Sequence, residues 1–351
     1  MKFEIENEII NQYLHLLSDD VPDFLYEYAN VPELKRLKGI SMISACESSK
    51  LIPVNFFHNR YEHSIGVALI VWNFTKDKKQ TIAGLYHDIA TPSFSHVIDY
   101  LHGDYEKQEY TEGFTEKAVR NSKEIMALLK RDNINVDEIK DYHIYTIADN
   151  DTPKLSADRL EYSLSDGLTT QDAFTLESIN RIYEDLKVIK NEQGEDELGF
   201  GHIEIAEEYV EGASKLWQLF SGNPENCMVM HFWKDILKLM ISQNYISEND
   251  LYNLSEMEIA DIIKNGSNKV IANAFEIFSK SERVERSDIL LEDKYCVPTK
   301  TKKRYNNPLV QINENGEAKR IYDISQKGKR IIDGIKDFQD SKYSCLNIKF
   351  K

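Results

Sequence analysis

A short stretch of this 351-residue chain concentrates side chains that could hold a metal. His87 and Asp88 are adjacent at the end of an apolar helical run, and His96 follows shortly after Pro92. Imidazole and carboxylate groups are the usual protein ligands of catalytic transition metals. Two neighbouring residues on one helix do not face the same way, so a shared site requires the helix to end at this pair. Pro92 predicts such a break, because it pushes the preceding residue out of the helical conformation.

A second segment offers a cation beside a candidate ligand. Residues 58–68 begin a predicted helix in which Arg60 and His63 are three positions apart and therefore share a face. Taken alone, the segment is more simply interpreted as a surface arginine in a salt bridge and a core histidine.

A third segment, further along the chain, carries carboxylates at helical spacing. Asp158, Tyr162 and Asp166 lie at i, i+4 and i+8, which places two carboxylates and a phenol on one helix face. Leu160 and Leu164 lie on another face and would hold the helix in the core. The alternative is an ordinary solvent-exposed face.

Together, the three segments supply two imidazoles and two carboxylates: His63, His87, Asp88 and Asp158. This mixed set suits one divalent transition metal (Mn²⁺, Fe²⁺, Co²⁺, Ni²⁺ or Zn²⁺) better than Ca²⁺, and Mg²⁺ is also compatible. It leaves coordination positions for water and for a substrate oxygen, as catalysis requires.

Another His–Asp combination follows the proline turn. His96 and Asp99 lie at i and i+3, a spacing that suits a dyad in which the carboxylate orients the imidazole and raises its basicity. The polar residues 102–112 then form either a lid-like loop over a pocket or a plain solvated loop.

Composition restricts the partners. Hydrophobic residues make up 41% of the chain, as in folded globular proteins, and the formal net charge of −16 opposes binding to long nucleic acids. A single nucleotide in a locally basic pocket is compatible with this charge. The longest apolar run, residues 66–72, is far shorter than the roughly 20 residues that span a bilayer. No signal-peptide pattern follows the acidic N-terminus, so we expect a soluble, cytoplasmic protein with no membrane partner.

The spacing of the cysteines also favours a cytoplasmic location. They lie far apart and form no CxxC pair, so free thiols in a reducing cytosol are the simplest expectation for Cys46, Cys227, Cys296 and Cys345.

Apolar periodicity predicts a mostly α-helical protein. Helices are expected over residues 3–17, 31–40, 58–68, 81–88, 94–100, 114–129, 135–148 and 156–166, and from 171 to about 290. Residues 299–305 are basic, and an Asn-Gly turn at 315–316 predicts a β-hairpin. We therefore expect a main helical domain, residues 1–290, and a small α/β appendage, residues 291–351. The basic hairpin would either bind an allosteric or neighbouring-subunit phosphate or serve only for packing.

The order and context of these motifs resemble the HD-domain metal-dependent phosphohydrolases. Within them, the chain is most similar to the branch that contains the deoxynucleoside triphosphate triphosphohydrolases. The resemblance covers residues 30–170 and rests on five segments: residues 32–37, 58–67, 87–89, 94–96 and 158–162, with Asp166. It implies an HD-domain helical bundle whose motif core is residues 30–170.

The resemblance also implies roles for the residues. His63, His87, Asp88 and Asp158 would hold the metal, Arg60 would contact the phosphates, and His96 and Asp99 would lie in the catalytic pocket. Tyr162 and Asp166 would face the sugar. The metal and Arg60 would neutralise charge on a phosphoryl group while an activated water attacks phosphorus. The expected substrate is a nucleotide or a related small phosphate ester, and the relatives suggest a homo-oligomer.

Two positions depart from the family pattern. Thr91 replaces the middle histidine of His-Asp-x-Gly-His, and a neutral threonine cannot act as a cationic donor or a proton shuttle. Glu112 follows Thr111 where a later His-Glu usually lies. Glu112 would serve as an acid, a base or an additional ligand, which makes it a fourth catalytic candidate beside His96, Asp99 and Arg60.

Two other functions remain open. A di-iron oxygenase would draw ligands for a second metal from His96, His102 and Glu112. A nucleotide-sensing or nucleotide-binding protein with little catalysis would fit Thr91, Glu112 and the basic tail.

Overall fold

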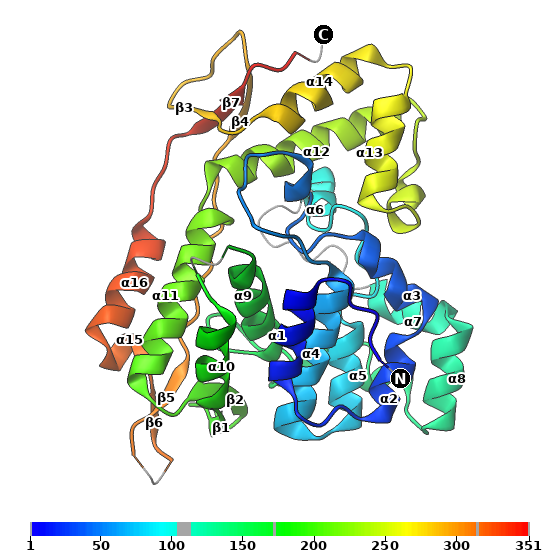
Figure 1. Ribbon diagram of the computed structural model, residues 1–351. Coiled ribbons are helices and arrows are strands. Elements are labelled where there is room, and N and C mark those ends of the chain that lie inside the picture. Colours follow the sequence, from blue (N-terminus) through cyan, green and yellow to red (C-terminus); the bar gives the residue numbers. More distant parts are fainter. Residues whose placement is uncertain (1, 104–113, 171–172, 314–315, 350–351) are drawn as a thin grey trace.

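The computed structural model describes residues 2–103, 114–170, 173–313 and 316–349. Helices dominate it, as predicted, and two small sheets accompany them (Figure 1). The helices are α1 (Glu8–Leu17), α2 (Asp23–Ala29), α3 (Pro32–Lys35), α4 (Arg60–Thr75), α5 (Lys78–Tyr86), α6 (Val97–His102), α7 (Thr115–Asn121), α8 (Lys123–Arg131), α9 (Ala157–Thr170), α10 (Leu176–Glu184), α11 (Ile203–Leu219), α12 (Pro224–Ser242), α13 (Glu256–Asn265), α14 (Lys269–Lys280), α15 (Ile321–Ile324) and α16 (Gln326–Asp337). None of the described helices is long and apolar enough to cross a membrane.

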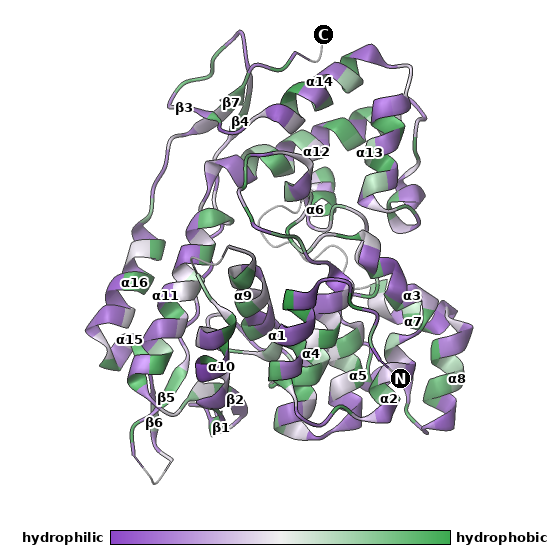
Figure 2. Ribbon diagram, viewed as in Figure 1, coloured by the Kyte–Doolittle hydropathy of each residue, from purple (hydrophilic) through white to green (hydrophobic). Residues whose placement is uncertain are grey.

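Two hydrophobic cores organise the helices. The larger one lies among α1, α4, α5, α9, α10 and α11, and the second lies among α6, α12, α13 and α14 (Figure 1). Helix α4 is the centre of the first core: residues 60–71 are all buried, and α1, α5 and α9 pack against it. This burial explains the apolar run at residues 65–71 of α4. Figure 2 shows apolar residues concentrated on α4, α5 and α12.

The sheets join distant parts of the chain. Their strands are β1 (Leu186–Lys190), β2 (Asp196–Phe200), β3 (Glu285–Ser287), β4 (Tyr295–Pro298), β5 (Leu309–Gln311), β6 (Ala318–Arg320) and β7 (Tyr343–Leu346). One sheet has the order β1-β2-β5-β6 and the other β3-β7-β4. The expected antiparallel pair β5–β6 is present, but β5 also pairs in parallel with β2. The sheet therefore crosses the proposed division at residue 290, which stays a prediction.

Three secondary-structure predictions were wrong. The single helix expected over 114–129 is two helices, because the Ser122 side chain caps α8 by accepting from Ile125 N. Residues 135–148 form two short 3₁₀ turns, Val136–Glu138 and Tyr142–Ile144, instead of a helix. The helical pattern beyond 171 is interrupted by the β1–β2 hairpin, whose turn requires Gly194 at a φ of 79°.

The expectation of four free thiols was also wrong. Cys296 on β4 and Cys345 on β7 form a disulfide, while Cys46 and Cys227 are free and buried. The two bonded cysteines are far apart in sequence, and only the pairing of β4 with β7 places them opposite each other.

A buried ion pair joins strand β6 of the C-terminal hairpin to strand β2, so its removal should destabilise the fold. The Arg320 guanidinium donates to both Glu197 oxygens, at 2.6 and 2.9 Å, and the Glu197 side chain is fully buried. We expect Arg320→Ala to lower the free energy of unfolding by about 3–5 kcal/mol in urea denaturation, because it leaves a buried carboxylate unpaired. Lys319→Ala, at an exposed neighbour, is the control and should change it by less than about 0.5 kcal/mol. Equal effects of the two substitutions would contradict this role of Arg320.

Candidate metal centre

Three elements bring the four candidate ligands together. His63 lies in the first turns of α4, whose start is fixed by the capping box of Asn59 and Glu62. Helix α5 ends at Tyr86, so His87 and Asp88 occupy the turn that follows, where the sequence predicted a break. Asp158 lies in the first turn of α9.

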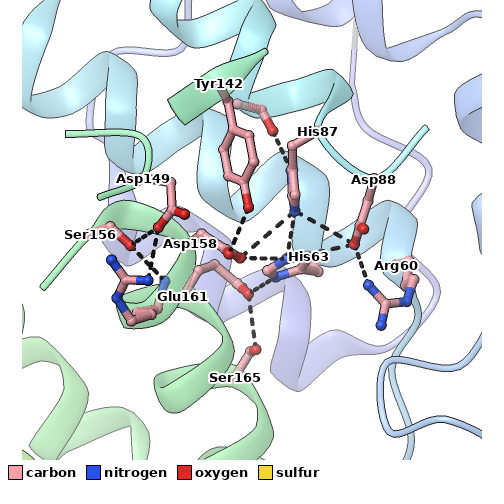
Figure 3. Close-up of polar contacts among 12 residues, drawn as sticks. Arg60, His63, His87, Asp88, Tyr142, Asp149, Ser156, Asp158, Glu161 and Ser165 are labelled. Atoms are coloured by element: carbon pink, nitrogen blue, oxygen red, sulfur yellow. Dashed lines mark hydrogen bonds and ion pairs between the residues drawn. The ribbon is translucent and has the colours of Figure 1, made fainter. Parts of the chain in front are cut away.

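The ligand atoms of these residues converge (Figure 3). His63 Nε2 lies 3.2 Å from His87 Nε2 and 3.2 Å from Asp158 Oδ1. His87 Nε2 lies 3.5 Å from Asp88 Oδ2 and 3.7 Å from Asp158 Oδ1. The ligand atoms of His63, His87 and Asp88 all lie within 4.8 Å of one another.

Hydrogen bonds on the far side of each imidazole fix which nitrogen faces the centre. His87 Nδ1 lies 2.7 Å from the carbonyl oxygen of Gly84, and a carbonyl can only accept, so Nδ1 carries the proton. His63 Nδ1 bonds in the same way to the carboxylate of Glu161. Both Nε2 lone pairs therefore point at the carboxylates of Asp88 and Asp158. Acceptors that converge in a buried place require a cation, so this donor set fits a divalent metal.

Glycine allows the approach of Glu161. Gly66 lies one turn after His63 on α4, and a Cβ at that position would come within 2.5 Å of Glu161 Oε1. Glu161 and His63 are each about 1% exposed, so their contact is shielded from water. Sequence reasoning missed Glu161, although its position three residues after Asp158 was a usable signal.

The pKa values show how strongly the centre favours positive charge. Burial lowers the pKa of His63, but the carboxylates of Glu161 and Asp158 outweigh it and raise that pKa to about 10. Burial opposes the ionisation of Asp88, but Arg60, His87 and His63 hold its pKa well below the usual range. A metal cation bound at His63 Nε2 would balance the same carboxylates that raise this pKa.

Arg60 and Thr91 hold Asp88 from two sides. Arg60 Nη1 donates to Asp88 Oδ2, and Arg60 Nε donates to Ser95 Oγ at 2.7 Å. Thr91 Oγ1 donates to Asp88 Oδ1 at 2.8 Å. The threonine that departs from the family pattern therefore orients a candidate ligand, a role for which a hydroxyl is sufficient.

The second core holds the loop that carries Ser95. Phe94 and Ser95 both adopt left-handed backbone conformations, with φ of 65° and 47°, which cost of order 1–3 kcal/mol each in residues other than glycine. The Phe94 amide donates to Glu256 Oε1 at 2.8 Å, and the Ser93 amide donates to Leu251 O at 2.7 Å. Leu251 and Glu256, more than 150 positions further along the chain, thus position Ser95, which accepts from Arg60.

The remaining candidates have different placements. His96 Nδ1 lies 3.0 Å from Asp99 Oδ2, and Asp99 is buried behind it. Tyr162 lies on α9, and so does Asp166, whose Oδ1 is 3.3 Å from His58 Nε2. The proposed catalytic Glu112 lies outside the described residues.

The described ligands for a second metal are not brought together. His102 Nε2 lies 2.9 Å from Glu248 Oε1, so this imidazole is engaged by a different carboxylate from the one that holds His96.

A cavity of about 1100 Å³ connects most of these groups. All four candidate ligands line it, together with Arg60, His96, Tyr162 and Asp166. Tyr142 also contributes, with its ring 4.9 Å from that of His87 and its hydroxyl 3.3 Å from Asp158 Oδ2. The cavity is large enough for a small phosphorylated molecule.

Loss of the Thr91 hydroxyl should weaken metal binding. We expect Thr91→Val, which keeps the shape of the side chain, to reduce Mn²⁺ affinity about 10-fold in isothermal titration calorimetry, because Asp88 loses the donor that orients it. Thr75→Val, at the end of α4 and remote from the cavity, is the matched control and should leave the affinity unchanged. The same affinity in both variants would rule out this role of Thr91.

Comparisons with known proteins agree with this geometry. Residues 60–160 match the family model described as the HD domain. The chain is 27% identical to an uncharacterised protein, YdhJ, of Bacillus subtilis, over 83% of this chain and 85% of that protein. It is 22% identical to the metal-dependent phosphohydrolase cns2 of Cordyceps militaris, over 85% of this chain and 83% of that protein.

Solved structures share the fold over nearly the whole length. A phosphohydrolase from Bacteroides thetaiotaomicron superposes with a TM-score of 0.65 at 15% identity, covering 94% of this chain and 97% of that one. A hypothetical protein from Aquifex aeolicus gives 0.59 at 17% identity, covering 93% and 92%. The converging histidines and aspartates thus lie in the segment, residues 60–160, that matches the HD domain.

Proposed function

We propose that this protein is a metal-dependent phosphohydrolase that acts on a nucleotide or a related small phosphate ester. The observation that carries the proposal is the convergence of four acceptor atoms, from two imidazoles and two carboxylates, beside Arg60 on the wall of the 1100 Å³ cavity. The HD domain match and the name of the fungal relative support it.

The proposed metal ligands are His63, His87, Asp88 and Asp158. Held there, a divalent metal supplies Lewis-acid chemistry, which neutralises charge on a phosphoryl oxygen and lowers the pKa of water. Arg60 is only 5% exposed and lines the cavity beside the candidate ligands, so we assign it to the same phosphoryl group.

His96 is the proposed proton acceptor. The Asp99 carboxylate accepts the Nδ1 proton of His96, which leaves Nε2 free to take a proton from the attacking water. Burial lowers the pKa of His96, and the Asp99 hydrogen bond only partly offsets this effect. The imidazole is therefore neutral at pH 7, as a general base requires.

Tyr162 and Asp166 are proposed to bind the rest of the substrate. Burial, followed by the nearby Glu161 charge, raises the pKa of Asp166 to about 7. Burial lowers the pKa of the adjacent His58 to about 3, so His58 is neutral and does not hold Asp166 ionised. Near neutral pH Asp166 can thus donate or accept a hydrogen bond, which suits a substrate hydroxyl.

Phosphate release is the direct measurement of this function. We expect the Mn²⁺-loaded or Co²⁺-loaded protein to hydrolyse at least one member of a panel of nucleoside mono-, di- and triphosphates and simple phosphate esters. His87→Gln should lower kcat at least about 1000-fold, since a ligand and its charge balance are lost. His15→Gln, at an exposed histidine of α1, is the control and should retain full activity. No turnover, with melting temperatures raised by nucleotides, would instead favour the nucleotide-binding alternative.

The pH dependence tests the His96–Asp99 assignment. Protonation of His96 below its lowered pKa should remove the base, so kcat/KM should fall on the acidic side of pH 6.5. Asp99→Asn removes the contact that raises this pKa, so the acidic limb should move to lower pH while kcat decreases. An acidic limb that stays in place in Asp99→Asn would contradict the assignment.

A di-iron oxygenase is the competing enzyme class. Elemental analysis decides between the two, because one metal per chain supports the hydrolase and two irons per chain support the oxygenase.

A further inference from the structure

The basic segment, residues 300–304, lines the same cavity as the candidate metal ligands. It contains Lys300, Lys302, Lys303 and Arg304 and no acidic residue, in a chain whose formal net charge is −16. The segment lies outside residues 60–160, which match the HD domain. Its charge is therefore a local feature of one wall, supplied by the C-terminal part of the chain.

Hydrogen bonds within and beside this segment hold it in place. Trp217 Nε1 on α11 donates to the carbonyl oxygen of Lys302 at 2.8 Å. The Thr299 amide donates to Lys342 O at 3.0 Å, and the Asn306 side chain donates to the Tyr209 hydroxyl at 2.7 Å. Figure 1 shows the chain between β4 and β5 running along α11. The segment is thus a fixed part of the wall.

The positive charge of Arg304 acts on three residues proposed for catalysis or substrate binding. It lowers the pKa of His96, of Tyr162 and of Asp166, although burial is the larger influence on each. His96 immediately precedes α6, and Tyr162 and Asp166 lie on α9. Arg304 lines the same cavity as these three residues. Arg304 and Lys302 are half-buried, which strengthens their attraction for an anion relative to an exposed cation.

We propose that the basic segment is an anion subsite that binds a second phosphate, or another anionic group, of the substrate. This inference rests on the proposed function and specifies the substrate: a small molecule with one anionic group at Arg60 and the metal ligands and another at Lys302 and Arg304. The segment determines specificity. A metal at the candidate ligands would bind any phosphoryl group, whereas Lys302 and Arg304 raise the affinity only of substrates that carry a second negative charge.

Binding of inorganic pyrophosphate to the metal-free full-length protein tests the subsite separately from catalysis. Without metal, the ligand carboxylates repel anions, so the loss of affinity when a residue of the basic segment is substituted reports on that segment, separately from Arg60. We expect saturable binding by the unmodified chain, weakened about 10-fold by Lys302→Gln and by Arg304→Gln, because each removes a charge-assisted hydrogen bond. Lys319→Gln, an exposed lysine on β6, is the charge-matched control and should bind as before.

The outcomes separate the two proposals. Pyrophosphate binding that is absent, or equal in all variants, overturns the subsite. Selective weakening together with no turnover of any phosphate ester supports the subsite and contradicts the proposed function. Circular dichroism melting identifies variants that fail to fold. If Arg304→Gln is one of them, Lys300→Gln, at an exposed lysine of the same segment, replaces it. Weakened pyrophosphate binding by Lys300→Gln then supports the subsite, and unchanged binding contradicts it.

Discussion

The charge balance among the buried imidazoles and carboxylates of the candidate metal centre constrains the elements around it. Two imidazole lone pairs and two carboxylates face one another, and each imidazole is fixed in this orientation by an acceptor on its far side. Such an arrangement is unfavourable by itself and becomes favourable only with positive charge at its centre. The surrounding structure maintains it: α4 is buried along most of its length, Gly66 admits Glu161, and Arg60 balances Asp88.

Both hydrophobic cores contribute to that point. The first core supplies α4 and α9, which carry His63 and Asp158, and α5, whose end leads into the turn with His87 and Asp88. The second core supplies the contacts of Glu256 and Leu251 that hold Ser93 and Phe94, and the backbone strain at Phe94 and Ser95 is sustained by those contacts. The site therefore depends on residues that belong to no local motif.

Sequence reasoning succeeded where the information is local. The His87–Asp88 pair before Pro92 predicted a helix end, and helical spacing placed Asp158, Tyr162 and Asp166 on one helix. It failed where long-range pairing decides, as in the β1–β2 hairpin and the disulfide between Cys296 and Cys345. Thr91 was recognised as a departure from the family pattern, but its hydrogen bond to Asp88 depends on the path of the turn, which spacing alone does not reveal.

The basic segment and the candidate metal ligands come from different parts of the chain. The candidate ligands lie within residues 60–160. The basic segment follows β4, a strand that pairs with β7 near the end of the described residues. Substitutions in residues 300–304 therefore change the wall of the cavity without replacing any of the four candidate ligands.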